Sequence, residues 1–221
     1  MLLVAADTSG KHGSIALARG DVDGSCIVIE TVSLEGNAFS AQLVPQIIAL
    51  LSKHRFDKKE IGGFVVVSGP GSFTGLRVGL AAIKALAEVL VKPIAAVSLL
   101  DAVASEAQGD IFAALDAGRQ QVYVGEYKVS PAGMVRLSGR SMTCDEFVNS
   151  VSGSKVVTPD SGIAEIARSA GASVRFIESP GTDVIARLGW KKILAGQTLL
   201  PDELEPNYMS RSEGEIFSKR F

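Results

Sequence analysis

Short runs of hydrophobic residues alternate with polar turns at the start of the chain. Residues 2–6 form a continuous apolar run that ends at Asp7-Thr8-Ser9-Gly10, a pattern typical of a buried strand that leads into a turn. Residues 14–19 and 26–34 predict two more strands. Because the turn between these two runs is short and rich in Gly and Asp, we expect them to form an antiparallel hairpin.

The period then becomes helical over residues 38–54, where Pro45 predicts a kink or a later helix start. A β-branched run over 63–68 precedes a glycine-rich loop and a long helix over 75–91. Further strands are expected at 94–97, 111–115, 121–129, 134–141 and 155–158, and further helices at 99–107, 145–151 and 182–194.

Both halves of the chain therefore place strands first and helices after them. This order predicts an α/β protein with two lobes and mixed sheets flanked by helices. We expect an N-terminal lobe over residues 1–100, which carries the glycine loop, and a C-terminal lobe over 101–200. Residues 201–221 are expected to form a tail, and its return to the first lobe is left open.

The composition is that of an ordinary folded protein, with 47% hydrophobic and 21% charged residues. A net charge of −2 argues against a chain that grips nucleic acid alone, so any RNA contact would be shared with a basic partner. Cys26 and Cys144 match no metal or redox spacing. The sequence shows neither a signal peptide nor an apolar stretch long enough for a membrane span, so we expect a cytoplasmic protein.

The glycine-rich loop over residues 69–75 allows two interpretations. Glycines between a strand and a helix expose backbone N–H groups to an anion, which makes Gly69 and Gly71 candidates for phosphate contact. The loop nevertheless lacks the Lys-Ser/Thr of a Walker motif and the third glycine of a dinucleotide motif. The alternative is a tight turn in which the glycines permit close packing.

Asp7 and Thr8 are the other candidates for cofactor contact, since a carboxylate and hydroxyls at a strand end are typical Mg²⁺–phosphate ligands. A turn stabilised by its own side chains explains the same residues and is the favoured interpretation. No catalytic residue and no metal site is predicted. His12 and His54 match no ligand pattern, and Ser72 lacks the frame of a nucleophile elbow.

Two broadly apolar helices in one small lobe suggest a partner surface, although burial in the lobe's own core explains the same pattern. A small-residue stripe through Gly79 would allow another helix to approach closely. The residues expected to help form the partner surface are Phe39, Leu43, Ile47, Leu76, Gly79 and Ile83.

With these residues assembled, the sequence resembles the TsaB (YeaZ) family of the bacterial machinery that makes threonylcarbamoyladenosine (t6A) in tRNA. The most specific match is the run Ser68-Gly69-Pro70-Gly71-Ser72-Phe73-Thr74-Gly75-Leu76-Arg77-Val78-Gly79. Supporting matches are Ala6-Asp7-Thr8-Ser9, Asp116-Ala117 followed by Gln121-Val122-Tyr123, and Leu204-Glu205-Pro206-Asn207-Tyr208.

The resemblance implies a fold of the actin/Hsp70/sugar-kinase (ribonuclease H-like) type. It also implies a non-catalytic subunit that binds and activates the transferase TsaD, with TsaE completing the complex. No cofactor of its own is expected, because ATP or ADP and the metal would be held by TsaD, and tRNA would be met only within the complex. A homodimer is conceivable when the partner is absent, and the family's grouping with M22 peptidases implies no proteolysis.

This chain departs from the family pattern at two places. Phe39-Ser40 stands where members commonly have His-Ser, so this chain lacks that histidine as a metal ligand, which argues further against metal chemistry. The usual Asp-Ala-Arg reads Asp116-Ala117-Gly118, with Arg119 one position later, which leaves the role of Arg119 open. The alternative function is an active actin-like ATPase or sugar kinase, with Asp7 and the glycine loop on the phosphates.

Overall fold

The computed structural model describes residues 1–35, 38–207 and 209, and divides the chain into two compact units. Unit 1 comprises Met1–Leu99 together with Pro180–Asn207, and unit 2 begins at Leu100 and includes the chain up to Ser179. Residues 208 and 210–221 of the expected tail, among them Tyr208 of the closing motif, lie outside the described residues.

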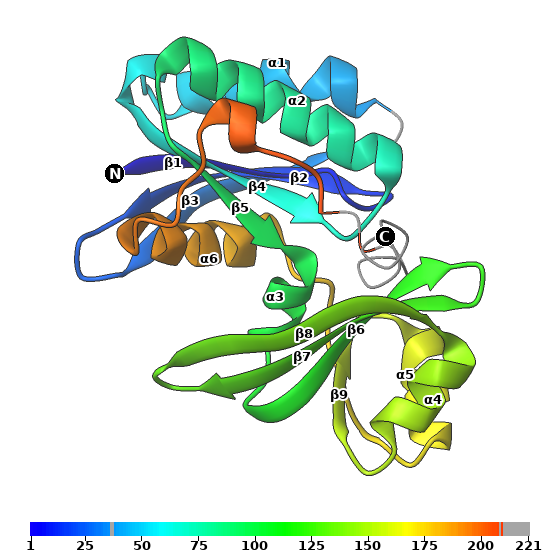
Figure 1. Cartoon of the computed structure of the whole chain (residues 1–221). Helices are drawn as coiled ribbons and strands as arrows, with labels where there is room; N and C mark the ends of the chain where they lie inside the picture. The colour runs from blue at the N-terminus through cyan, green and yellow to red at the C-terminus, as the bar shows by residue number, and fades with distance from the viewer. Residues whose placement is uncertain (36–37, 208, 210–221) are drawn as a thin grey trace, which may run out of the picture. The chain divides into compact units, whose positions relative to one another are not determined.

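Unit 1 is built on a five-stranded sheet in the order β3-β2-β1-β4-β5 (Figure 1). Its strands are β1 (Leu2–Asp7), β2 (Gly13–Gly20), β3 (Cys26–Leu34), β4 (Ile61–Gly69) and β5 (Ile94–Ser98). The strands β1, β4 and β5 run parallel, whereas β2 and β3 form the expected antiparallel hairpin beside β1. The central strands are apolar throughout because helices cover both of their faces.

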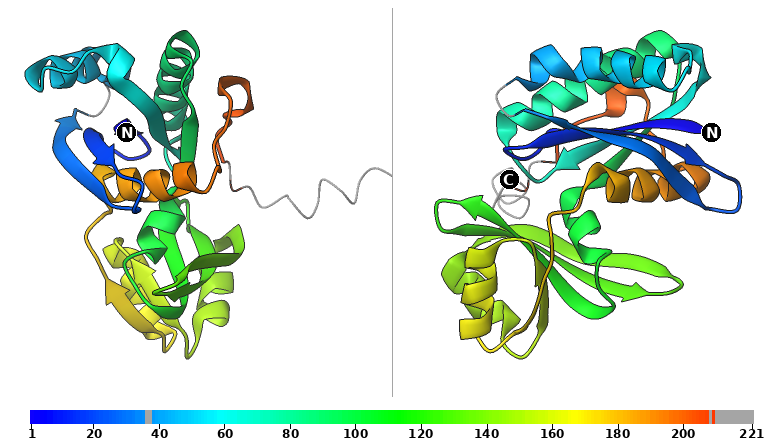
Figure 2. Two further views of the ribbon diagram at one scale, coloured as in Figure 1. Left: turned by 90° about the vertical axis from the view of Figure 1, so that its left-hand side faces the viewer. Right: turned by 180° about the vertical axis from the view of Figure 1, so that it is seen from behind.

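The helices of unit 1 are α1 (Phe39–Lys53), α2 (Phe73–Leu90) and α6 (Thr182–Leu194), with short 3₁₀ turns η1 (Lys58–Glu60) and η2 (Pro201–Glu203). Helices α1 and α2 lie side by side on one face of the sheet, and α6 covers the opposite face (Figures 1 and 2). Helix α1 continues through Pro45, which is exposed, so the helix starts earlier than the proline alone would suggest.

Unit 2 repeats this plan with a sheet in the order β10-β9-β6-β7-β8. Its elements are α3 (Leu99–Ala104, which starts at the unit boundary), β6 (Gly109–Gly118), β7 (Gln121–Ser130), β8 (Gly133–Thr143), α4 (Cys144–Val151), β9 (Lys155–Thr158), α5 (Ser161–Ser169) and β10 (Ser173–Phe176). Phe147, Val151 and Ile163 of α4 and α5 pack with apolar residues of the sheet in one buried cluster. The hydroxyl of Tyr127, a fully buried residue, donates to Asp101 Oδ1 at 2.8 Å.

The structure differs from the expected lobe boundaries at one end. The first boundary falls at Leu99, close to the expected residue 100, but the chain returns to unit 1 at Pro180 rather than continuing in the second lobe to residue 200. The cause is α6, which buries Ile185, Ala186 and Trp190 and packs on the first sheet. An amphipathic pattern shows that a helix covers a sheet, but it does not show which one.

Two elements of unit 2 have no counterpart in the sequence-based expectation. Helix α5 begins two residues after Pro159, between the predicted strand over 155–158 and the predicted helix over 182–194, and β10 follows it as the edge strand. Both elements are short, and β10 is largely exposed, so neither has a long hydrophobic period to indicate it.

Candidate functional site

The carboxyl ends of β1 and β4 meet at one edge of the unit 1 sheet, which we call the β1/β4 edge. It comprises Asp7, Thr8 and Ser9 after β1, and the loop from Gly69 to Ser72 that leads into α2. Because β1 and β4 are parallel neighbours, both segments leave the sheet at the same edge. In open α/β sheets this is the place where ligands bind. The structure therefore brings together all four residues that the sequence singled out for cofactor contact.

The two segments of this edge are bonded to each other. Thr8 is buried, and its hydroxyl donates to the carbonyl of Gly75 at 2.7 Å. The backbone N–H of Ser72 donates to the carbonyl of Ser9 at 2.7 Å, and Ser72 Oγ caps α2 by accepting from Gly75 N. These bonds use groups that a phosphate would otherwise engage.

Close approach of the two segments accounts for the glycines. A Cβ atom on Gly71 would lie 2.6 Å from the carbonyl oxygen of Ser9, and one on Gly79 would lie 2.3 Å from Thr8 Oγ1. Gly69 has φ +128°, which favours glycine, and lies against the carbonyl of Asn207. Of the two interpretations of the loop, these contacts favour tight packing. Phosphate contact by Gly69 and Gly71 stays a prediction.

Asp7 is the one carboxylate at this edge. It is half-buried and accepts hydrogen bonds from Ser9 N at 2.8 Å and Ser9 Oγ at 2.6 Å, so the turn expected at this strand end is present. Burial raises the pKa of Asp7, and the two bonds from Ser9 oppose that rise. A carboxylate so placed is less stable in its charged form than an exposed one.

Exchanging Asp7 for asparagine tests this electrostatic cost. Because the pKa of Asp7 is higher in the folded than in the unfolded protein, the folded state binds the proton more tightly, and the associated stability is lost as pH rises through the folded pKa. Asparagine keeps an acceptor oxygen for Ser9 without the charge. We therefore expect the free energy of unfolding of Asp7→Asn to rise relative to that of wild type as pH is raised from 4 to 8.

Urea unfolding at several pH values measures this difference. A variant that becomes less stable relative to wild type as pH rises would show that the charged form is favoured by a partner. Other titrating groups cancel in the comparison, since they are common to both proteins.

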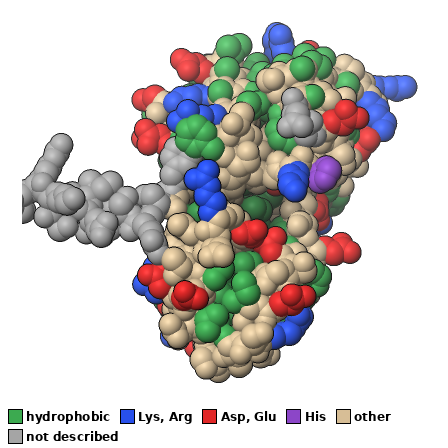
Figure 3. All heavy atoms as spheres, turned by 90° about the vertical axis from the view of Figure 1, so that its right-hand side faces the viewer, with side chains coloured by type: hydrophobic (Ala, Val, Ile, Leu, Met, Phe, Trp, Pro, Cys, Tyr) green, Lys and Arg blue, Asp and Glu red, His purple; other side chains and the backbone are tan. Residues whose placement is uncertain are grey.

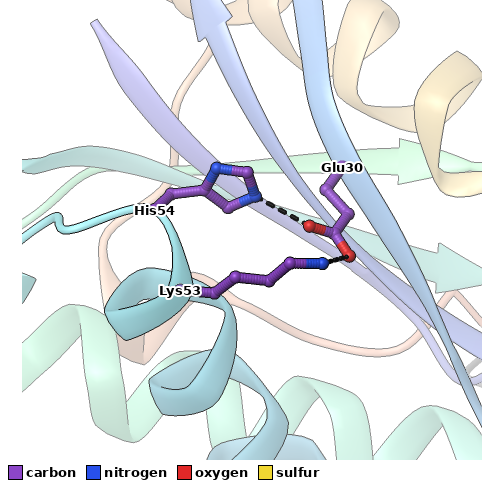
Figure 4. Close-up of polar contacts among 3 residues, drawn as sticks. All are labelled: Glu30, Lys53 and His54. Atoms are coloured by element: carbon purple, nitrogen blue, oxygen red, sulfur yellow. Dashed lines mark hydrogen bonds and ion pairs between the residues drawn. The ribbon is translucent and has the colours of Figure 1, made fainter.

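His54 lies at the C-terminal end of α1, where the sequence placed it. Its Nε2 lies 2.7 Å from Glu30 Oε2 on β3, and Lys53 Nζ lies 2.6 Å from Glu30 Oε1 (Figure 4). The hydrogen bonds from Lys53 and His54 lower the pKa of Glu30. This cluster ties the end of α1 to an edge strand, and it is separate in the chain from the β1/β4 edge.

The residues predicted for the partner surface are buried, which fits the alternative that the sequence left open, burial in the lobe's own core. All six of its residues are buried in unit 1: Phe39, Leu43, Ile47, Leu76, Gly79 and Ile83. Helices α1 and α2 pack on the unit 1 sheet and on each other, so these buried residues belong to the core of the unit. The helical period identified the apolar face of each helix correctly, but that face is the core of this unit.

The opposite faces of the two helices carry a different apolar set. Ile48 of α1 and Val89 of α2 are 58% and 80% exposed. Exposed small or apolar residues accompany them at helical spacing: Ala41, Pro45 and Ala49 on α1, and Ala81 and Ala85 on α2. We call these seven residues the outer helix surface. The signal available in the sequence was a second apolar stripe on helices whose first stripe was already complete.

The start of α2 adds an exposed aromatic–cation pair. The guanidinium of Arg77 lies 3.8 Å from the ring centroid of Phe73, which is 55% exposed. Their i, i+4 spacing on the helix is the sequence signal for this contact.

Charge is distributed without one dominant sign. On the face shown in Figure 3, Lys and Arg side chains are scattered among Asp and Glu. Within the described ranges, no group of three or more His, Cys, Asp or Glu side chains is placed to hold a metal ion. No helix in the described part of the chain is long and apolar enough to cross a membrane.

Comparisons with known proteins agree with this architecture. A family model described as "TsaD: tRNA N6-adenosine threonylcarbamoyltransferase" matches residues 33–144. The protein TsaB of Bacillus subtilis is 35% identical over 131 residues, which cover 58% of this chain and 56% of that protein. TsaB of Buchnera aphidicola is 30% identical over 134 residues, covering 57% and 60% of the two chains. The chain thus spans less than two thirds of the curated relatives that it matches.

Among solved structures, YeaZ from Pseudomonas aeruginosa superposes with a TM-score of 0.78 at 22% identity, covering 94% of this chain and 99% of that one. The chain therefore has the fold of that protein, an α/β fold of two units with mixed sheets flanked by helices, as the sequence predicted. The family model, which matches half of the chain, and the named relatives identify the family: the chain belongs to the TsaD-related family, as a member of its TsaB (YeaZ) group.

Proposed function

We propose that this chain is a non-catalytic subunit that binds and activates a TsaD-type threonylcarbamoyltransferase in forming t6A at adenosine 37 of tRNA. The names of its TsaB relatives and the description of the family model support a role in this modification. Contacts with TsaE and with tRNA would occur within the assembled complex.

The observation that carries the partner role is the outer helix surface. Other apolar residues of α1 and α2 already form the buried faces of these helices. Ile48 and Val89 lie outside those faces and are 58% and 80% exposed. Exposed apolar residues repeated along two adjacent helices suit docking on another helical surface. We propose that TsaD covers this surface, in place of the buried residues first expected to do so.

The non-catalytic role is supported by how the β1/β4 edge uses its polar groups. The hydroxyl of Thr8 and the N–H of Ser72 are bonded within the edge, and the glycines are needed for close packing. On this proposal the ATP or ADP and the metal are held by TsaD. The alternative, an ATPase or sugar kinase, draws its support from the half-buried Asp7 at the same edge.

The decisive experiment is reconstitution from purified proteins. This chain alone is expected to hydrolyse ATP no faster than background and to show no specific tRNA binding at physiological salt. Cognate TsaD supplied with tRNA, TsaE and threonylcarbamoyl-adenylate should form t6A efficiently only when this chain is added.

Two outcomes would contradict the proposal. ATP hydrolysis by the pure chain that Asp7→Ala abolishes would favour the kinase alternative. Equal t6A formation with and without this chain would show that the chain is not required for the reaction.

A further inference from the structure

A groove of about 560 Å³ opens in unit 1 between the end of α2 and residues 198–202. The wall formed by these residues is fixed at the edge of the sheet, because Leu199 N donates to Ile94 O at 2.8 Å and Ile94 N donates to Leu199 O at 3.3 Å. Lys84 Nζ of α2 donates a hydrogen bond to the carbonyl oxygen of Asp202 at 3.4 Å. In Figure 1 this orange segment with η2 runs beside α2.

The α2 end of the groove has an unusual residue at its turn. Val91 adopts φ 53° and ψ 58°, the left-handed conformation that ends a helix and that glycine normally occupies. Val91 N donates to Glu88 O and Lys92 N to Ala87 O, the hydrogen-bond pattern of a Schellman turn. A β-branched residue is strained in this conformation. Packing of the Val91 side chain does little to offset the strain, because that side chain is 87% exposed.

The lining combines apolar and acidic groups. Leu200, on the facing wall, is 63% exposed, and Pro93 and Leu199 contribute further apolar surface. Glu88 and Asp202 are exposed acids at the rim, and Glu203, exposed beside Asp202, accepts from Leu200 N at 2.8 Å. Lys92 in the lining and Lys84 beside Asp202 offset part of this negative charge. The last turn of α2 has no basic residue, so the negative end of its dipole adds to these acids.

We propose that this groove binds a basic, apolar stretch of a partner polypeptide, with Val91 and Leu200 contacting its apolar side chains and Glu88 and Asp202 its Lys or Arg. The strained and exposed Val91 is explained if its side chain is covered in a complex. The acidic rim selects the sign of the partner's charge. This surface is distinct from the outer helix surface, and the inference does not depend on TsaD being the partner proposed above.

Fluorescence anisotropy with two peptide pools tests the proposal on the full chain. One pool holds labelled nonapeptides in which Lys or Arg alternates with Leu, Ile, Val or Phe, and the other replaces Lys and Arg by Glu and Asp. The basic pool should bind saturably, at least tenfold more tightly than the acidic pool, and more weakly as salt is raised. Amide NMR shifts on binding should be confined to the end of α2 and residues 198–202.

Matched variants distinguish binding in the groove from nonspecific binding of the peptides to exposed apolar residues. Leu200→Ser should weaken binding by about tenfold, whereas Ile27→Ser should not, although Ile27 on β3 is equally exposed at 64%. Val91→Gly should also weaken binding, while raising the melting temperature by roughly 2–4 °C because the strain is relieved. Glu88→Gln should weaken binding of the basic pool, and Glu165→Gln on α5 should have no effect.

Three results would overturn the proposal: no saturable binding of the basic pool, equal losses in Leu200→Ser and Ile27→Ser, or a Val91→Gly variant that binds like wild type. Ile48→Asp on the outer helix surface should leave peptide binding unchanged, so failure here and failure of the TsaD proposal are distinguishable.

Discussion

Gly79→Leu is expected to lower the free energy of unfolding by about 2–5 kcal/mol. A Cβ atom at this position would lie 2.3 Å from Thr8 Oγ1, and that hydroxyl cannot move without losing its 2.7 Å bond to Gly75 O. The higher helix propensity of leucine recovers only about 0.8 kcal/mol. Thermal melts and urea titrations of the purified chain measure the loss.

Ala81→Leu is the matched control, since Ala81 is exposed one half-turn away on the same helix. Its stability should stay within about 0.5 kcal/mol of wild type. If Gly79→Leu instead melted like wild type but no longer bound TsaD, the glycine would belong to a partner surface, as the sequence first suggested.

Ile48→Asp should weaken binding to TsaD by about 100-fold or more, which corresponds to at least about 2.7 kcal/mol. The change places a charge among exposed apolar residues of the outer helix surface, where a bound partner would exclude water from it. In the free chain the same side chain is in contact with solvent, so the melting temperature should not fall. Calorimetric titration with TsaD, paired with thermal melts, gives both quantities.

Ile27→Asp controls for the loss of any exposed isoleucine, because Ile27 is 64% exposed but lies on β3. Undiminished binding of a well-folded Ile48→Asp protein would exclude this part of α1 from the interface. Since the outer helix surface would also suit a homodimer, light scattering should accompany the titration. If the wild-type chain is a dimer and Ile48→Asp makes it monomeric, a second copy of the chain competes with TsaD for the outer helix surface.

The β1/β4 edge shows which features could be predicted from local sequence and which could not. The apolar run of β1, the break at Asp7 and the glycines before α2 indicate a strand, a turn and a helix start, and all three are present. Whether the glycines meet a ligand or another segment depends on what lies within 3 Å of each. Gly71 and Gly79 meet Ser9 and Thr8, which are about sixty or more positions away in the chain, so sequence spacing carries no record of the contact.

The pattern of hydrophobic residues determined by itself that this chain forms strands, helices and two α/β units, because period and turn chemistry are local properties. It also located the apolar faces of α1 and α2, and the residues around Gly71 matched the family motif by resemblance. Only the tertiary structure decided which apolar face is core and which is open, as Ile83 and Ile48 show. The same holds for α6, which returns to unit 1, and for the turn that leaves Val91 strained and exposed. Burial is set by what packs on a residue from elsewhere in the chain, and that information is non-local.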